Sequence, residues 1–174
     1  RGGQIPGGYG LANMNGMSDE SIVSFYYSLN DNYSLEYWSY IYGKTLNGSR
    51  GLLVNLNFSG EGADCKPVIN GTYDAKLIAD FQYLNRLSCP VFIRIGGEMN
   101  VWSKMASAQD FKGAYNHIAQ LARTHAPKAA LVFSPNFSAS KGVDMDSFYP
   151  NNAYVDWVGT SLYYKKFANN GDTR

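Results

Sequence analysis

Residues 90–102 read PVFIRIGGEMNVW. The run from Pro90 to Ile95 is apolar apart from Arg94, is rich in β-branched residues and ends at a glycine pair, which predicts a short strand. A continuous apolar run without polar alternation is typical of a strand that is buried on both faces of a parallel sheet. A carboxylate, Glu98, follows the predicted end of this strand, beside an amide and an indole.

Predicted strands and helices alternate on both sides of this stretch. Apolar runs predict further strands over residues 22–27, 51–58, 130–133 and 156–162. Apolar residues at helical spacing predict helices over residues 73–87 and 108–125. Another helix is predicted from Ser34, which can cap it, to the Asn47-Gly48 pair that ends it. The Gly-rich segment 1–19 offers a short strand over residues 9–12, and residues 59–68 are predicted as a loop.

The alternation predicts an α/β fold with a parallel sheet. Neither a dinucleotide-binding glycine motif nor a P-loop follows any predicted strand, and each strand–helix unit spans roughly 35–40 residues. These features favour a (β/α)8 TIM barrel over a doubly wound sheet, although periodicity alone leaves both open. A closed barrel typically takes ~250 residues. Residues 1–174 are therefore expected to form a single partial barrel domain, with only about strands 2–6 represented, residues 1–19 irregular and further units after Arg174.

Composition excludes several classes of protein. The formal net charge is +1, so no electrostatic attraction to nucleic acid or to an anionic membrane is expected. No apolar stretch is long enough for a transmembrane helix. Cys65 and Cys89 are too few for a disulfide framework or a zinc site. They fall at opposite ends of the predicted barrel and are expected to be free thiols.

Polar side chains follow the predicted strands. In chain order they are Asn55 and Asn57, then Glu98 and Asn100, then Ser134 and Asn136, then Ser161 and Tyr163. Because barrel enzymes place their reacting groups at the carboxyl ends of the strands, these residues are expected to share one mouth.

These positions resemble glycoside hydrolase family 26, the β-mannanase family in the clan of retaining (β/α)8 glycosidases. The resemblance rests on four blocks in the family's order: residues 52–58, 71–100, 133–136 and 148–163. Together with their surroundings they cover about residues 22–165, so that order and spacing count for more than any single motif.

The resemblance implies a retaining hydrolase of a β-linked polysaccharide, with mannan as the first substrate to consider. Glu98 matches the general acid/base, and Arg94 matches an arginine inside the barrel that orients carboxylates. The residues expected to bind substrate are Asn57, Asn100, Trp102, Asn136 and Tyr163. Carboxylate chemistry of this kind needs no cofactor. A polysaccharide substrate implies a secreted or cell-surface protein, although the sequence has no targeting signal.

Two features depart from the family. Its mannanases usually have histidine directly before the acid/base, where this chain has Gly97. The family's nucleophile follows strand seven, which is expected beyond Arg174. A loop carboxylate could instead form an inverting pair with Glu98, but ion pairing or solvation is the simpler role for each of these residues: Glu61, Asp64, Asp144 and Asp146.

The departures leave a second class of function open. The alternative is a catalytically inactive, glycosidase-like carbohydrate-binding or scaffold protein, in which Glu98 is a structural partner of Arg94 or Lys104. His117 and His125 fall on a helix away from the predicted mouth and are expected to be surface or packing residues.

Overall fold

Six parallel strands form one sheet in the computed structural model, which describes residues 2–4, 22–38, 50–58, 65–101, 107–138 and 142–162. The strands are β1 (Gly2–Gln4), β2 (Ile22–Ser28), β3 (Gly51–Asn57), β4 (Val91–Ile95), β5 (Ala130–Phe133) and β6 (Trp157–Val158). They lie in chain order, and every neighbouring pair is parallel. A doubly wound sheet reverses its strand order at a switch point, and the described strands have none. The predicted α/β class with a parallel sheet is confirmed, while closure into a barrel stays a prediction.

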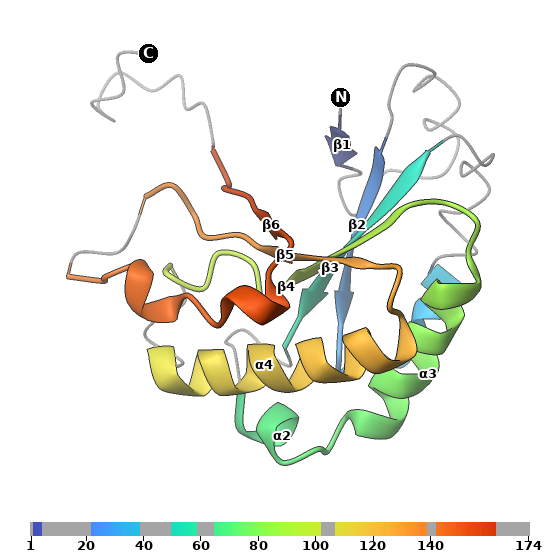
Figure 1. The fold of residues 1–174 in the computed structure, drawn as a ribbon, viewed down its shortest axis with the longest axis horizontal. Helices are drawn as coiled ribbons and strands as arrows, with labels where there is room; N and C mark the ends of the chain where they lie inside the picture. Colours follow the sequence, from blue (N-terminus) through green and yellow to red (C-terminus); the bar gives the residue numbers. More distant parts are fainter. Residues whose placement is uncertain are drawn as a thin grey trace.

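The helices lie along one side of this sheet (Figure 1). They are α2 (Cys65–Ile69), α3 (Asp74–Arg86) and α4 (Ala108–His125), and α4 packs against both of the others. Parallel strands that are joined by right-handed crossovers and always added in the same direction place every helix on the same face. The opposite face is therefore free of the described helices, and its side chains build the candidate site.

Local sequence signals place the long helices closely. Both α3 and α4 agree with the predicted segments to within one residue at each end. The Ser107 hydroxyl caps α4 by accepting a hydrogen bond from the Asp110 amide at 3.0 Å. Residues 35–38 are helical, and the Ser34 hydroxyl caps them by accepting from the Tyr37 amide at 3.1 Å. The rest of this predicted helix lies outside the described residues.

Three sequence predictions differ from the structure. The predicted loop 59–68 contains the start of α2, a five-residue helix whose short apolar side is Cys65 and Val68. Within the segment 1–19, which was predicted to be irregular, Gly2–Gln4 form β1. The possible strand over 9–12 lies outside the described residues. The strand predicted over 156–162 is only Trp157–Val158, followed by an isolated bridge between Asn136 and Ser161. Such short elements hold too few apolar residues to show a period in sequence.

The predictions for the two cysteines and for His117 are supported. Cys65 and Cys89 are free thiols. His117 is half-buried and bridges α4 to the start of α3 through a 2.7 Å contact between its Nε2 and Asp74 Oδ1. Among the described residues, no helix has both the length and the apolar character that crossing a membrane requires.

Alternation along the strands separates two kinds of surface. On β3, Leu52, Val54 and Leu56 are buried among the helices, while Asn55 lies on the opposite face. On β4, the core against the helices contains Val91, Ile93 and Ile95, and Arg94 lies on the opposite face. Parallel pairing aligns Asn55 with Arg94. The helix face is thus an apolar core, and the other face is polar at its centre.

A buried carboxylate lies on the helix side of the sheet. Asp80 of α3 is 4% exposed, and its Oδ2 accepts a 2.6 Å hydrogen bond from the Tyr27 hydroxyl. Its Oδ1 accepts a 3.2 Å hydrogen bond from the Leu35 amide. Burial raises the pKa of Asp80 above its ordinary value of 3.8, although the hydrogen bonds from Tyr27 and Leu35 oppose the shift. Asp80 thereby connects α3 to β2 and to the helical segment 35–38.

This raised pKa predicts a pH-dependent stability. The folded protein holds the Asp80 proton more tightly than the unfolded chain does, so its contribution is largest at low pH. The contribution of Asp80 to the free energy of unfolding should fall as pH rises from about 3.8 through the raised pKa. Urea denaturation at a series of pH values, on wild type and Asp80→Asn, measures this. The wild-type advantage should shrink across that window, and a difference that is constant with pH would contradict the prediction.

Candidate active site

The site begins at the turn that follows β4. Gly96 has φ 55° and Glu98 has φ 63°, so a non-glycine residue adopts the left-handed conformation. For such a residue this costs about 1–3 kcal/mol, which surrounding contacts must offset. The Glu98 amide donates to the Ser134 carbonyl at 2.9 Å, and the Gly96 amide donates to the Leu56 carbonyl at 2.9 Å. Neighbouring strands on both sides therefore hold the turn.

A steric constraint also explains why residue 96 is a glycine. A Cβ there would lie 2.8 Å from the Phe111 ring and 3.0 Å from the Phe58 ring. These two aromatic residues belong to the core between the sheet and α4. The glycine lets the turn approach that core closely, which fixes where the following Glu98 can lie.

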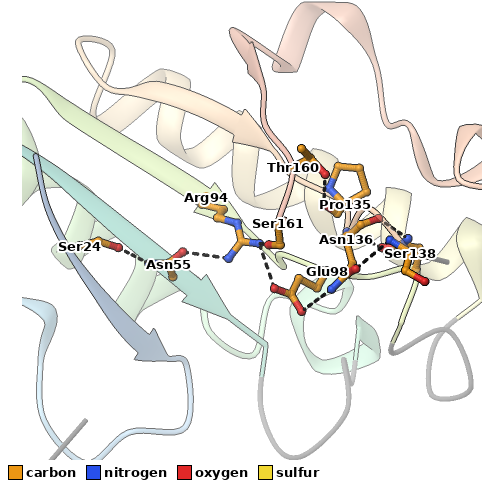
Figure 2. A network of polar contacts seen from close by, with 10 residues as sticks. Ser24, Asn55, Arg94, Glu98, Pro135, Asn136, Ser138, Thr160 and Ser161 are labelled. Atoms are coloured by element: carbon orange, nitrogen blue, oxygen red, sulfur yellow. Dashed lines mark hydrogen bonds and ion pairs between the residues drawn. The ribbon is translucent and has the colours of Figure 1, made fainter. Parts of the chain in front are cut away.

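Arg94 organises the polar face of the sheet (Figure 2). It is 9% exposed, and its Nη1 donates to Asn55 Oδ1 at 3.1 Å. Asn55 Nδ2 in turn donates to Ser24 Oγ at 2.8 Å and to the Phe25 carbonyl at 3.0 Å. Arg94 Nη2 donates to Ser161 Oγ at 2.7 Å. One guanidinium thus connects β2 and β3 to the segment after β6.

Glu98 lies between this guanidinium and an amide. Its Oε1 is 3.8 Å from Arg94 Nη2, and its Oε2 accepts a 3.2 Å hydrogen bond from Asn136 Nδ2 (Figure 2). The exposed fraction of the Glu98 side chain is 16%. The carboxylate is therefore oriented from two directions while part of it stays accessible. An oriented, partly accessible carboxylate can exchange a proton with a bound molecule.

Gly97 makes room for the arginine. A Cβ at this position would collide with Arg94 Cζ and lie 2.7 Å from both Nε and Nη1. The Arg94 side chain thus folds back over the peptide at Gly97 to reach Ser161 and Glu98. A side chain at position 97 and this arginine conformation exclude each other.

Asn100 supports the site from below the surface. It is 0% exposed, and its two amide atoms bond to the backbone of Asn136. Asn100 Oδ1 accepts from the Asn136 amide at 2.7 Å, and Asn100 Nδ2 donates to the Asn136 carbonyl at 2.8 Å. A side chain with this burial and these partners fixes the protein backbone, so the predicted substrate contact of Asn100 finds no support in the geometry.

The structure brings together six of the residues singled out in the sequence: Asn55, Arg94, Glu98, Asn100, Asn136 and Ser161. Asn57 ends β3 half-buried and enters the fold through its carbonyl, which accepts from the Leu29 amide at 3.1 Å. The predicted contributions of Trp102 and Tyr163 fall on residues outside the described part of the chain.

The other loop carboxylates are placed as follows. Asp144 and Asp146 form a local turn in which Asp144 Oδ1 accepts from the Asp146 amide at 3.1 Å. Glu61 and Asp64 lie outside the described residues. No group of three or more His, Cys, Asp or Glu side chains that could hold a metal ion occurs in the described ranges.

Ser161 was among the polar residues expected at the mouth, whereas Ser24 was not predicted as a site residue. Each hydroxyl lies within the polar network, and Ser24 is 8% exposed. A signal for Ser24 does exist in the sequence, because a serine interrupts the apolar run of β2 as Arg94 interrupts that of β4. The bond between Ser161 and Arg94 has no signal in the sequence, because the two residues are 67 positions apart.

Comparisons with known proteins find distant similarities in sequence and in fold. No protein-family model matches the chain. The chain is similar to a Vibrio sp. protein named β-1,3-xylanase TXYA, at 24% identity over 121 residues, which cover 68% of this chain and 26% of that protein. It also resembles the crystal structure of the YdhT protein from Bacillus subtilis, with a TM-score of 0.60, 18% identity and coverage of 81% and 53% of the two chains. At that identity the second likeness concerns the fold alone.

The chain spans about a quarter of the length of the xylanase and about half of the YdhT structure. The chain is therefore distantly similar to one part of a protein named as a xylanase.

The contact between Gly97 and Arg94 predicts a stability effect. Gly97→Ala should displace the guanidinium and leave buried acceptors on Asn55 and Ser161 without their donor. The expected cost is about 1–3 kcal/mol in the free energy of unfolding, measured by urea denaturation.

Gly159→Ala is the matched control. A Cβ at Gly159 would meet its nearest atom, Ser134 Oγ, at an ordinary 3.5 Å. This variant should unfold like the wild type, to within about 0.5 kcal/mol. Equal stabilities of the two alanine variants would show that Arg94 does not depend on the glycine at position 97.

Proposed function

We propose that this chain is the central part of a glycoside hydrolase in which Glu98 is the general acid/base. The observation that supports this best is the placement of Glu98. It follows a central strand at the carboxyl edge of a parallel sheet, in a left-handed backbone conformation, between Arg94 and Asn136. Carboxyl edges of parallel strands are where barrel enzymes hold their reacting groups. The distant similarity to a named β-1,3-xylanase supports the same class.

The proposal includes a (β/α)8 barrel. Sequential parallel strands with helices on one side support it, because further units of the same kind would curve the sheet toward closure. The edge strand β6 fits this as well. Trp157 is 60% exposed and Val158 is 65% exposed, and a following strand would cover them.

The proposed mechanism is retaining. Glu98 first protonates the glycosidic oxygen while a second carboxylate attacks the anomeric carbon, and Glu98 then removes a proton from the water that releases the sugar. The two carboxyl groups must lie about 5–5.5 Å apart. In the family that the chain resembles, the nucleophile follows strand seven, so it is assigned to a later unit of the whole protein.

Two substrates follow from different observations. The resemblance to family 26 favours β-mannan, and the name of the Vibrio protein favours β-1,3-xylan. Gly97 offers no imidazole to a substrate, and the Arg94 guanidinium occupies the adjacent space. This difference makes β-mannan a less favoured substrate for the proposed enzyme than another β-linked polysaccharide. A polymer of either kind is too large to enter a cell intact, so the proposal includes action outside the cell.

The decisive test is Glu98→Gln in the whole protein, assayed by reducing-sugar release from β-1,3-xylan, β-mannan and mixed β-glucans. Loss of a general acid should lower kcat by about 10²–10⁴-fold. The loss in kcat/KM, which reports the first step, should be much smaller on aryl glycosides with acidic leaving groups, because these depart without protonation. That difference separates the loss of an acid from general damage to the site.

Glu36→Gln is the control, because Glu36 is an exposed glutamate on the helical segment 35–38. It should hydrolyse polysaccharide as the wild type does. If the wild type binds these polysaccharides but releases no sugar from any of them, the protein is a carbohydrate-binding relative and Glu98 has a structural role. If Glu98→Gln keeps full activity, another residue is the acid.

A further inference from the structure

Asn136 lies at a junction between two segments that approach it from opposite sides. On one side it forms an isolated parallel bridge with Ser161, in which the Phe137 amide donates to the Ser161 carbonyl at 3.0 Å. The Ser161 amide completes the bridge by donating to the Pro135 carbonyl at 3.0 Å. In a parallel bridge of this kind, the N–H and C=O of the central residue point away from the partner. The backbone of Asn136 therefore needs partners on its other side.

Asn100 supplies both of these partners. Its side-chain amide accepts from the Asn136 N–H at 2.7 Å and donates to the Asn136 carbonyl at 2.8 Å. One side chain thus replaces the hydrogen bonds of a neighbouring strand at the point where β4 has already turned away. Because Asn100 is 0% exposed, water does not compete for either bond.

The side chain of Asn136 is oriented by the same junction. Asn136 Oδ1 accepts a 2.9 Å hydrogen bond from the Ser138 amide, so the opposite end, Nδ2, faces Glu98. An amide has one donor end and one acceptor end, and the Ser138 N–H can bond only to the acceptor. The donor at 3.2 Å from Glu98 Oε2 therefore depends on the backbone position at residue 136.

We infer that Asn100 is a positioning residue that acts on Glu98 through Asn136, instead of a substrate ligand. The inference rests on the proposed function of Glu98 and deepens it. Asn100 fixes the backbone of Asn136, this backbone directs Nδ2, and Nδ2 orients the Glu98 carboxylate. Asn100 itself is enclosed by protein and has no accessible surface for a sugar.

A double-mutant cycle in the whole protein tests this order of action. Asn100→Ala, Asn136→Ala and the double variant are compared on the polysaccharide that the wild type hydrolyses. Each single variant should lower kcat by roughly 10-fold or more with little change in KM, as expected when an acid loses its orientation. The double variant should be no worse than Asn136→Ala alone, because Asn100 has nothing left to position.

The pH dependence of kcat/KM gives a readout that general destabilisation does not produce. A hydrogen bond donated to a carboxylate favours its ionised form, and the acid works only when protonated. Its loss should move the basic limb of the profile to higher pH in Asn100→Ala and Asn136→Ala alike. Tyr27→Phe is the control, because it removes a buried hydrogen bond to Asp80 on the helix side of the sheet. It should lower stability and leave the profile unchanged.

Three results would overturn the inference. A raised KM with normal kcat in Asn100→Ala would identify a substrate contact. Additive losses in the double variant would show that Asn100 acts independently of Asn136. A profile unchanged from the wild type, with lower stability alone, would show a purely structural role. If Asn100→Ala does not fold, Asn100→Ser, which keeps a shorter polar group, is measured in the same way.

Nuclear magnetic resonance separates failure of this inference from failure of the proposed function. In the wild type, the Asn136 side-chain amide signals should shift as Glu98 titrates, and Glu98→Gln should abolish the shift. Asn100→Ala should also reduce it strongly. These signals need no catalysis, so they test the link from Asn100 to Glu98 even if the wild type hydrolyses no polysaccharide. An unchanged shift in Asn100→Ala would contradict the inference.

Discussion

The buried guanidinium of Arg94 is the constraint on which the polar face of the sheet depends. Arginine stays charged at every physiological pH, so it cannot escape the cost of burial by losing a proton. The surrounding residues must therefore satisfy the charge. Asn55 and Ser161 accept from it, Glu98 lies 3.8 Å away as its counter-charge, and Gly97 leaves the space into which it folds. Breaking one of these contacts leaves a buried donor without its partner, which is why the network is expected to respond as a unit.

The sheet separates this network from a second buried polar cluster. On β2, Ser24 lies on the polar face of the sheet and bonds to Asn55, while Tyr27 lies on the helix face and bonds to Asp80. Alternation along a strand sends such neighbours to opposite sides. The cluster on the helix side holds α3 against the sheet, and the network on the polar face orients Glu98. This division makes a substitution at Tyr27 a control for stability, since it lies behind the sheet from the candidate site.

Regular elements could be predicted from the sequence because their signals are local. The helix at 108–125 has an apolar stripe and a capping serine, and the central strands are unbroken apolar runs. The helix at Cys65–Ile69 is too short for such a pattern. In the site, the position of Glu98 at the carboxyl edge of the sheet was predictable from its place after a strand. The burial of Asn100 and the bond from Arg94 to Ser161 were not, because they depend on how segments far apart in the chain meet.

Position 97 connects this network to the choice of substrate. The mannanases that the chain resembles usually have histidine there, and an imidazole can donate or accept a hydrogen bond at the mouth of the site. In this chain the same volume holds the folded-back guanidinium of Arg94, and a Cβ at Gly97 would collide with it. A side chain at position 97 and this conformation of Arg94 exclude each other. Restoring histidine would first require a new place for a charge that is now satisfied by Asn55 and Ser161. The family that the chain resembles has an arginine at the position of Arg94 as well, so the proposed difference in substrate lies in residue 97 and in the path that it leaves for that arginine.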